Sequence, residues 1–543
     1  MADHEATTVV ERAHADAAET RQRPFDDGAG NGIAASVAAP ESTVDHRQIL
    51  VIFSGLMLAM LLAALDSTIV ATALPTIVGD LGGLEHLSWV VTAYLLAQTV
   101  VTPLYGKLGD LYGRKIVFQT AIVVFLIGSA LCGLSQNLPQ LILFRALQGF
   151  GGGGLIVTAT AIIGDIVTPR DRGRYQGIFG AVFGFASVAG PLLGGFFVDH
   201  FTWRWVFYIN LPVGAIALVV VAATLPSRAE RVHHQVDYLG SALIAIGLAC
   251  IVLFTSLGGT TYDWGSWQSI GLAVAGVVAL ALFVLVESRA AEPVLPPSLF
   301  RNRVFAVTSA VGLIIGLALF GTVTYLPLFL QVVNGASAQN SGLQLVPLMG
   351  GLLLTSIASG QLISRWGRYK IFPILGTAIT TVALFLLSRM GAGTSREVAA
   401  LNMFILGLGL GMVMQVLVIA VQNAVEYSQL GVATSGATLF RSIGGAVGTA
   451  IFGAIFANRL VVNLERYLPA GVSSDEMAGA QGNPAALAKL PPEVHHGFVL
   501  AYAHSLQTVF LIGVPIAALA FVLTWLLEER PLRQTVSTAA VAE

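Results

Sequence analysis

The fold is decided by the first long apolar run, which reads ILVIFSGLMLAMLLAALDSTIVATALPTI from Ile49 to Ile77. The run exceeds the roughly 20 mostly apolar residues that a helix needs to span a bilayer. Asp66 lies well inside it, where an ionised carboxylate costs about 2.5–3.5 kcal/mol. Such a group is retained where it faces protein or a water-filled cavity, so Asp66 is a candidate functional residue. The alternative is a structural Asp that hydrogen bonds to Ser or Thr on a neighbouring helix.

The composition is that of a polytopic membrane protein. The 543 residues are 55% hydrophobic and 11% charged, whereas globular domains average about 25% charged residues. The 59 glycines fit a bundle whose helices approach each other closely through small residues. The net charge of -2 gives no indication of a nucleic-acid partner. Cys132 and Cys250 fall inside apolar segments, so neither a disulfide framework nor a metal site is predicted.

Apolar runs long enough to span a bilayer recur along the chain, and we expect an all-α membrane protein with fourteen spanning helices. The runs lie at 49–72, 87–106, 116–134, 139–163, 174–198, 204–225, 238–257, 268–287, 305–330, 341–364, 370–388, 398–421, 434–457 and 505–527. They predict a six-helix bundle in 48–226, two extra helices in 227–303 and a second six-helix bundle in 304–528. Polar tails precede and follow at 1–47 and 529–543, and we expect the first to be disordered, not a cleaved signal peptide.

Lys and Arg residues concentrate in alternate connecting loops, which predicts the orientation. With the amino terminus inside, the expected cytoplasmic segments hold Lys107, Arg114, Lys115, Arg170, Arg172, Arg174, Arg228, Arg231, Arg289, Arg301, Arg303, Arg365, Arg368, Lys370, Arg530 and Arg533. The opposite loops hold only Arg204, Arg389, Arg396, Arg459, Arg466 and Lys489. We therefore expect both termini to be cytoplasmic. The long outer loop, 458–504, is compatible with either an ordered cap or a flexible connection.

Two short loops repeat a pattern in the two halves. The second helix of the first six is followed by GKLGDLYGRK at 106–115, and that of the last six by GQLISRWGRY at 360–369. The spacing of Gly, aromatic-Gly and Arg is the same, and only the first copy keeps the acid, Asp110, where the second has Ser364. Matching loops predict two related halves, as in transporters built from repeats around a central site.

Together these features resemble the major facilitator superfamily, specifically its fourteen-helix drug:proton antiporter branch, the EmrB/QacA-like multidrug exporters. The resemblance covers nearly all of residues 48–530. The loop at 106–115 resembles the superfamily's signature between helices two and three. This implies that Asp110 and Arg114 make charge contacts that stabilise one alternating state, although the loop's basic residues also anchor topology. The candidate switch residues are Gly106, Asp110, Gly113, Arg114 and Lys115.

The segment LILFRALQG at 141–149 resembles the family's fourth-helix motif, whose Arg is linked to proton transfer. The resemblance implies that Arg145 and Gln148 act with Asp66 in proton coupling or substrate binding. A guanidinium does not release its proton, so Arg145 would act on a nearby acid or pair with substrate. The alternative is an Arg that braces a loop or extends to the interface.

The segment GPLLGG at 190–195 resembles a motif characteristic of exporters in this superfamily. Proline kinks a helix and glycine admits a close partner, so this bend would shape the seal between the halves; a packing kink without directional meaning is the alternative. Its candidate residues are Gly190, Pro191, Gly194 and Gly195. The flanks of Asp66 and WRWVFYINLP at 203–212 resemble signatures of the fourteen-helix branch. Arg441 is a second intramembrane charge, with Asp110 or Glu426 as candidate partners.

The resemblance implies a proton-coupled secondary exporter of amphipathic drugs or similar small molecules, in the cytoplasmic membrane of a bacterium. Asp66 would take up a proton from outside and release it inside. Neither a cofactor nor ATP is expected, because the proton gradient drives transport and no Walker A sequence occurs. We expect no catalytic or metal site and no nucleic-acid partner. The alternatives are an importer or exporter dedicated to one metabolite or lipid and, remotely, a polytopic membrane enzyme.

Overall fold

The protein is all-helical in the part of the chain that the computed structural model describes, apart from one isolated bridge between Gly258 and Tyr262. The described residues are 46–81, 87–167, 171–225, 237–259, 262–290, 293–336, 338–469 and 490–532. The expected tail at 1–47 lies outside them except for its last two residues. Parts of the segments 227–303, 458–504 and 529–543 lie outside them too.

The first half contains the helices α2 to α8. They are α2 (His46–Leu81), α3 (Leu87–Tyr112), α4 (Arg114–Leu134), α5 (Leu138–Ile166), α6 (Arg172–His200), α7 (Trp205–Tyr208) and α8 (Asn210–Thr224). Two further helices follow, α9 (Tyr238–Leu257) and α10 (Trp267–Glu287). A 3₁₀ turn, η2 (Pro297–Arg301), leads into the second half.

The second half begins at α11 and ends with α20. Its elements are α11 (Arg303–Val323), α12 (Leu326–Leu328), the π-helical η3 (Phe329–Val333), α13 (Ala338–Gln344), α14 (Val346–Trp366), α15 (Ile371–Leu387), α16 (Arg396–Ala424), η4 (Tyr427–Gln429), α17 (Leu430–Tyr467) and α20 (Pro492–Thr524). The last two long helices, α17 and α20, have 38 and 33 residues. Both therefore exceed the roughly 20 residues that cross a bilayer.

Twelve of the described helices are long and apolar enough to cross a membrane. The multi-pass prediction is thus confirmed, whereas the number fourteen is not. The two remaining predicted segments are also helical, but they are not among these twelve helices. One forms α15, which has 17 residues. The other forms α3, which runs past its expected end at residue 106 into the charged loop.

Local sequence signals set the boundary between α4 and α5. Asn137 caps α5, since its side-chain oxygen accepts a hydrogen bond from the Gln140 N–H at 3.0 Å. Proline at the first turn of α5 suits a position whose N–H has no helical partner. Between α3 and α4 the chain turns at Gly113, whose φ of 89° favours glycine. Short polar caps thus separate helices that are otherwise continuous apolar runs.

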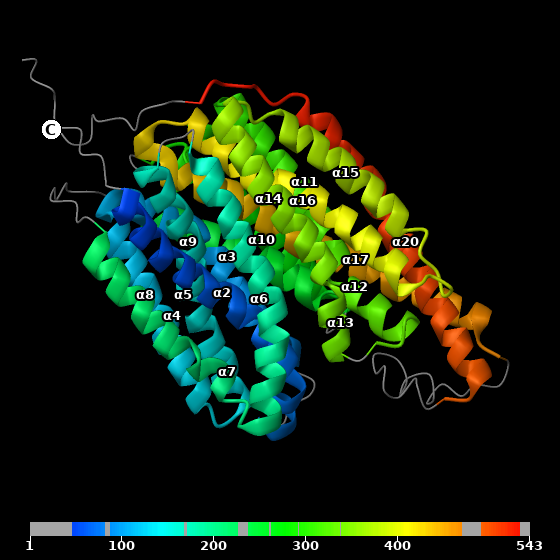
Figure 1. Ribbon diagram of the computed structural model, residues 1–543. Coiled ribbons are helices and arrows are strands. Elements are labelled where there is room, and N and C mark those ends of the chain that lie inside the picture. Colours follow the sequence, from blue (N-terminus) through cyan, green and yellow to red (C-terminus); the bar gives the residue numbers. More distant parts are fainter. Residues whose placement is uncertain are drawn as a thin grey trace, which may run out of the picture. The chain divides into compact units, whose positions relative to one another are not determined.

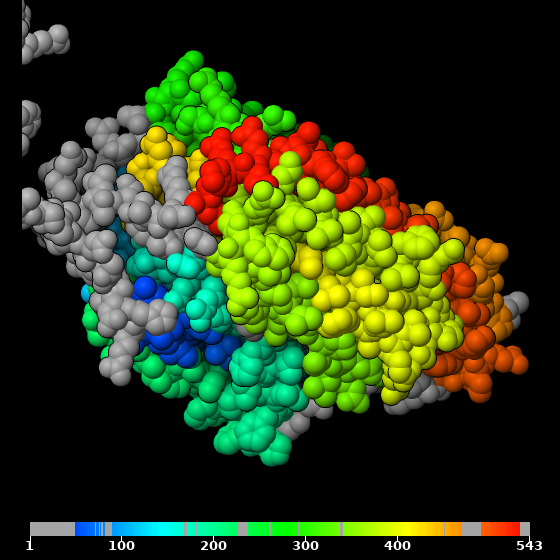
Figure 2. Space-filling view, turned by 45° about the horizontal axis from the view of Figure 1, so that its top comes forward, coloured from blue at the N-terminus to red at the C-terminus, as the bar shows by residue number. Residues whose placement is uncertain are grey.

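The two halves meet along two pairs of helices, α6 with α14 and α3 with α17. Within the first half α5 packs against α2, α3 and α4, and within the second α16 packs against α14 and α15. The extra pair, α9 and α10, packs together, and α9 contacts both α3 and α17 (Figure 1). Figure 2 shows one face on which second-half residues, green to yellow, lie beside first-half residues in blue and teal. The extra helices therefore flank one seam between the halves and insert into neither.

Candidate functional site

A buried ion pair joins α2 and α5 in the interior of the first half. Asp66, fully buried in α2, accepts a hydrogen bond through Oδ2 from Arg145 Nη1 at 2.5 Å. Its Oδ1 accepts from Gln148 Nε2 at 2.8 Å and from Asn210 Nδ2 at 3.2 Å. Three donors from α5 and α8 thus converge on one carboxylate. Removing such a pair from water is costly unless further hydrogen bonds satisfy both partners, and here the carboxylate has them.

Arg145 is held by contacts other than the carboxylate as well. Its Nη1 donates to Gln148 Oε1 at 2.8 Å, and its Nε donates to the Val90 carbonyl at 3.4 Å. The guanidinium carbon lies 4.2 Å from the centroid of the Tyr94 ring, within cation–π range. The guanidinium is therefore fixed from α3 and α5 and directed at Asp66.

A second set of polar groups ties this pair to α4. The Ser129 hydroxyl accepts hydrogen bonds from Gln148 Nε2 at 3.0 Å and Asn210 Nδ2 at 2.9 Å, and donates to the Phe207 carbonyl at 2.9 Å. The Tyr94 hydroxyl and Asn210 Oδ1 are buried and have no hydrogen-bond partner within the described residues. Buried polar atoms are normally bonded, so these two mark where water or a ligand would bond beside the pair.

Glycines let α5 approach its neighbours closely enough to form this network. A methyl group on Gly152 would lie 2.5 Å from the Tyr94 hydroxyl, and one on Gly128 would lie 2.6 Å from the Gln148 backbone. Gly149 similarly faces the backbone of Tyr94. The glycine run of α5 therefore serves helix packing, as its apolar continuation in the sequence indicates.

Residues 106–115, expected to form a loop, are the end of α3, the turn at Gly113 and the start of α4, and they connect the first half to the second. Asp110 accepts hydrogen bonds from the backbone N–H groups of Gly431 at 3.2 Å and Val432 at 2.9 Å. These residues form the first turn of α17, where the helix dipole favours a negative charge. Arg114 forms an ion pair with Asp110 and donates through Nε to Asp165 Oδ2 at 2.9 Å. A charge cluster from α3, α4 and α5 thus holds the amino end of α17.

Gly106 belongs to the same contact between the halves. A methyl group there would collide with the Ser435 side chain of α17. On the opposite pair of helices, Gly173 of α6 faces Gly360 of α14 equally closely. Gly360 opens the second copy of the repeated loop, so the two copies meet the opposite half at equivalent places.

The repeat also extends to the last helix of each half. Lys115 Nζ donates to the Leu225 carbonyl at the end of α8 at 2.7 Å. Lys370 Nζ donates to the Trp525 carbonyl at the end of α20 at 3.0 Å. A cation at a helix carboxyl end is favourable because the last carbonyls lack helical partners. In the second copy Tyr369 also donates to the Glu528 carbonyl at 2.9 Å, and burial raises the pKa of its phenol.

The exporter-like segment of α6 lies against α2 near Asp66. Methyl groups on Gly190 and Gly194 would contact Thr68 and Ile69, and Gly195 is buried. The Thr68 hydroxyl donates to the Ala186 carbonyl at 3.0 Å, which bonds the two helices directly. Pro191 lies inside α6 without ending it.

Arg441 lies apart from these groups, on α17 where it passes α11. A methyl group on Gly316 of α11 would collide with the Arg441 carbonyl, so the two helices pass closely there. Its guanidinium has no ion pair or hydrogen bond with any residue that the structure describes. The proposed pairing with Asp110 is not found, because that carboxylate is bound by Arg114 and α17, and Glu426 is exposed.

Sequence reasoning assigned three members of these networks no role in them. Ser129 and Asn210 are polar residues inside apolar segments, a signal that marks intramembrane sites. Asp165 lies near the end of α5, and its contact with Arg114 reveals a role. In the described residues no cluster of three or more His, Cys, Asp or Glu side chains is suited to a metal ion.

The architecture and motifs agree with comparisons to known proteins. The sequence model of the Major Facilitator Superfamily matches residues 56–238 and 231–449. The chain belongs to the major facilitator superfamily. Its similarity to an MFS-type transporter of Mycobacterium tuberculosis, named Rv1877 and described as uncharacterized, reaches 47% identity over 482 residues, or 89% of this chain and 70% of that protein.

Two relatives from Bacillus subtilis carry names that state a function. The multidrug transporter protein MdtP is 43% identical over 430 residues, covering 78% of this chain and 79% of its own. Multidrug resistance protein 3 is 36% identical over 475 residues, covering 86% and 93%. The resemblance to multidrug efflux transporters of this superfamily is therefore confirmed.

A solved structure gives the same fold at low sequence identity. The human organic anion transporter MFSD10 (TETRAN) superposes with a TM-score of 0.58 at 14% identity, covering 88% of this chain and 99% of its own. This similarity supports the fold alone.

Proposed function

We propose that this protein is a proton-coupled exporter of amphipathic small molecules, acting by alternating access in a bacterial cytoplasmic membrane. The observation that carries the proposal is the buried pair of Asp66 and Arg145. The multidrug transporters of Bacillus subtilis among its relatives favour drug-like substrates.

The pair couples protonation to rearrangement. Protonating Asp66 removes the counter-ion of Arg145, which cannot lose its own proton. A buried, uncompensated guanidinium is strongly unfavourable, so Arg145 must find water, substrate or another acceptor. Because Asp66 belongs to α2 and Arg145 to α5, their separation moves two helices of the first half. This motion would also change the hydrogen bonds of the Val90 carbonyl to Arg145 and of the Gln148 and Asn210 amides to Asp66.

Alternating access requires contacts that close one end of the transporter and can open. Asp110 on the α17 amino end is one such contact between the halves. Near it, Arg172 Nη1 donates to the Gln422 carbonyl of α16 at 3.4 Å. In the topology predicted from basic residues this end is cytoplasmic. The described conformation is then closed toward the cytoplasm, and substrate uptake from inside would break these contacts.

The available free energy is sufficient. A potential of about 100 mV is worth roughly 2.3 kcal/mol per charge, and about half a pH unit adds about 0.7 kcal/mol. Roughly 3 kcal/mol per proton sustains about a hundredfold gradient of a neutral substrate at one-to-one exchange.

We propose fourteen spanning helices, with both termini in the cytoplasm. The two additions to the twelve apolar spans are α3 and α15. Each lies among spanning neighbours, α3 against α5 and α15 against α16. Packing within the bundle, not lipid contact, would then hold the less apolar α3 in the membrane.

A second candidate function is export or import of one dedicated metabolite or lipid. The uncompensated guanidinium of Arg441 favours it, because a substrate with an acidic group would supply the missing counter-charge. A membrane enzyme is disfavoured, since the fold and the named relatives are those of transporters.

The proposal is tested with purified protein in liposomes under an imposed pH gradient, with ethidium as substrate. The wild type is expected to accumulate ethidium only when the gradient is present, and Asp66→Asn is expected to lose that accumulation. Asp263→Asn, which changes an exposed acid in the α9–α10 loop, is the control and should behave as wild type. Equal accumulation by wild type and Asp66→Asn would remove Asp66 from coupling. No accumulation by either would favour the dedicated transporter.

A further inference from the structure

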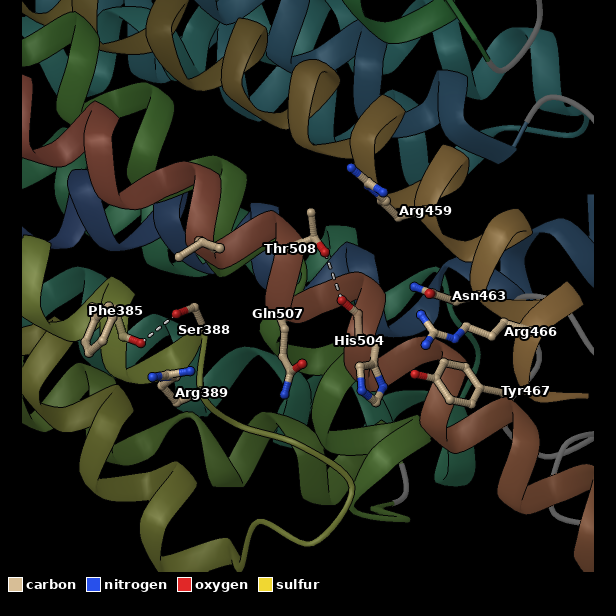
Figure 3. Close-up of a pocket in the computed structure, with 11 residues that line it drawn as sticks. Phe385, Ser388, Arg389, Arg459, Asn463, Arg466, Tyr467, His504, Gln507 and Thr508 are labelled. Carbon is tan, nitrogen blue, oxygen red and sulfur yellow. Dashed lines mark hydrogen bonds between the residues drawn. The ribbon is translucent and has the colours of Figure 1, made fainter.

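A cavity of about 440 Å³ opens between α15, α17 and α20, far along the chain from the Asp66 site. Figure 3 shows Arg459 and Arg466 extending from α17 and Arg389 from the end of α15, with His504 and Gln507 on α20 between them. It lies at the end of the second half where α17 ends and α20 begins.

The lining is strongly basic. Arg389, Arg459 and Arg466 keep their charge at any physiological pH, and none forms an ion pair with a residue that the structure describes. The guanidinium of Arg389 lies 5.4 Å from the Phe385 ring, and that of Arg466 lies 5.6 Å from the Tyr467 ring. Ring contacts at these distances leave the N–H donors free for an acceptor. Arg114 and Arg145, in contrast, are both paired with carboxylates.

The polar groups between these arginines are already fixed. His504 stacks on Tyr467 with ring centroids 4.9 Å apart, and its Nδ1 lies 2.9 Å from the Leu500 carbonyl. Gln507 Nε2 donates to the Met390 carbonyl at 2.9 Å, which joins α20 to the end of α15. Asn463 Nδ2 donates to the Ser505 hydroxyl at 2.9 Å, which joins α17 to α20. The cavity walls are therefore preorganised, which lowers the cost of binding.

These arginines lie on the expected outer side, whereas most Lys and Arg residues of the chain lie in the expected cytoplasmic segments. Six Lys and Arg residues are expected on the outer side, and three of them surround this cavity. Like charges around one cavity repel each other, and more strongly near a low-dielectric membrane than in water. An anion in the cavity would offset this repulsion.

The rim of the cavity is apolar and faces outward from the bundle. Phe385 and Leu511 belong to the lining and are 45% and 52% exposed. On a membrane helix such exposed side chains contact lipid. The ligand that fits is therefore amphiphilic, with an anionic group among the arginines and chains along this rim.

We propose that this cavity binds an anionic phospholipid head group, with Arg459 and Arg466 of α17 as the ligands of its phosphate and Arg389 on the opposite wall. Arginine matches phosphate oxygens with paired N–H donors, which makes it suited to this contact. The bound head group would connect α15, α17 and α20. The inference is independent of the transported substrate, and its test measures binding and stability, not transport.

The test compares thermal unfolding of the purified full chain with phosphatidylglycerol, phosphatidylcholine, or sodium phosphate at matched phosphate concentration and ionic strength. Native mass spectrometry counts bound phosphatidylglycerol in the same samples. The variants are Arg459→Gln/Arg466→Gln and, as control, Arg368→Gln, an exposed arginine at the opposite end of α15.

Phosphatidylglycerol is expected to raise the melting temperature of the wild type and of Arg368→Gln by several degrees more than phosphatidylcholine does. The double variant is expected to lose that difference and its bound phosphatidylglycerol. Equal stabilisation by sodium phosphate would overturn the lipid assignment and leave a free-anion site. Equal effects of the two lipids on the wild type, or an unchanged response of the double variant, would overturn the proposal altogether. The wild-type comparison holds even if the double variant folds poorly.

Discussion

Asp66 and Arg145 form an ion pair, and among the described residues neither has a second partner of opposite charge. The carboxylate takes three donors and the guanidinium adds a carbonyl and an aromatic ring, so both charges are well satisfied while the pair is intact. Loss of one partner leaves the other as a buried charge, which costs far more than loss of both. The pair is therefore stable in one protonation state and strained in the other.

This asymmetry predicts a strongly non-additive double-mutant cycle. Arg145→Gln alone is expected to lower the free energy of unfolding by about 3–5 kcal/mol. Adding Asp66→Asn should recover most of that loss, because the double variant buries no charge. Thermal unfolding of the four proteins in detergent measures the coupling. Additive losses would show that the pair contributes no mutual stabilisation.

Sequence alone located the charged members of this site but not their arrangement. Asp66 stands out because a charge inside an apolar run is costly, whereas Arg145 and Gln148 were expected to join it because 141–149 resembles a family motif. Asn210 was part of a recognised signature and Ser129 was unremarked, since a short polar side chain in a membrane helix usually bonds its own backbone. Their convergence depends on how α4 and α8 rotate against α2, which no local pattern encodes.

At the scale of elements, the amino end of α17 is where the first half hydrogen bonds to the second and packs against it. Its N–H groups bind Asp110, and Gly106 lets α3 lie against Ser435. Both contacts come from the repeated loop. The copy at 360–369 lacks the acid and meets α6 through backbone packing of Gly360 and Gly173.

Removing the Asp110 carboxylate should loosen the contact between the two halves at the amino end of α17. With Cys132 and Cys250 replaced, a Ser435→Cys reporter is expected to react slowly with a maleimide, because Ser435 is fully buried. Asp110→Ala should raise that reaction rate several-fold, since the α17 amino end loses its acceptor. Glu426→Ala removes an exposed acid nearby and should leave the rate unchanged. Equal rates for Asp110→Ala and its parent would show that Asp110 does not hold this end closed.

The α2–α6 contact makes a packing prediction. Gly190→Ala would push a methyl group against Thr68 and within 3.1 Å of the Ile69 nitrogen, which is expected to cost about 1–3 kcal/mol of stability. Gly350→Ala in α14 meets nothing within 4 Å and should be neutral or stabilising by roughly 0.5–1 kcal/mol. Melting temperatures compare the two. A harmless Gly190→Ala would mean that α2 and α6 are not in close contact.

For the molecule as a whole, the apolar runs predicted the helices well, because length and hydrophobicity suffice to mark a membrane helix. They did not predict the contacts between halves, which pair residues more than 300 positions apart, such as Asp110 and Val432. They also did not distinguish α3 and α15, which are not among the twelve apolar spans, from the other helices. The number of membrane-spanning helices therefore depends on how α3 and α15 pack in the bundle.

The fourteen-helix topology is tested by labelling single cysteines in intact cells with a membrane-impermeant maleimide. Asp263→Cys in the α9–α10 loop and Arg389→Cys after α15 are expected to react from outside. Arg301→Cys and Arg368→Cys are expected to react only after the membrane is permeabilised. Reaction of both Arg368→Cys and Arg389→Cys from one side would mean that α15 does not span.

The central claim, that Asp66 carries the exchanged proton, is tested most directly by measuring proton movement caused by substrate. Liposomes containing the protein are placed in weakly buffered medium, an ethidium gradient is imposed, and an external electrode records pH. The wild type is expected to move protons opposite to ethidium. Asp66→Asn is expected to let ethidium equilibrate with no proton movement. Proton movement by Asp66→Asn at the wild-type ratio to ethidium would contradict the account.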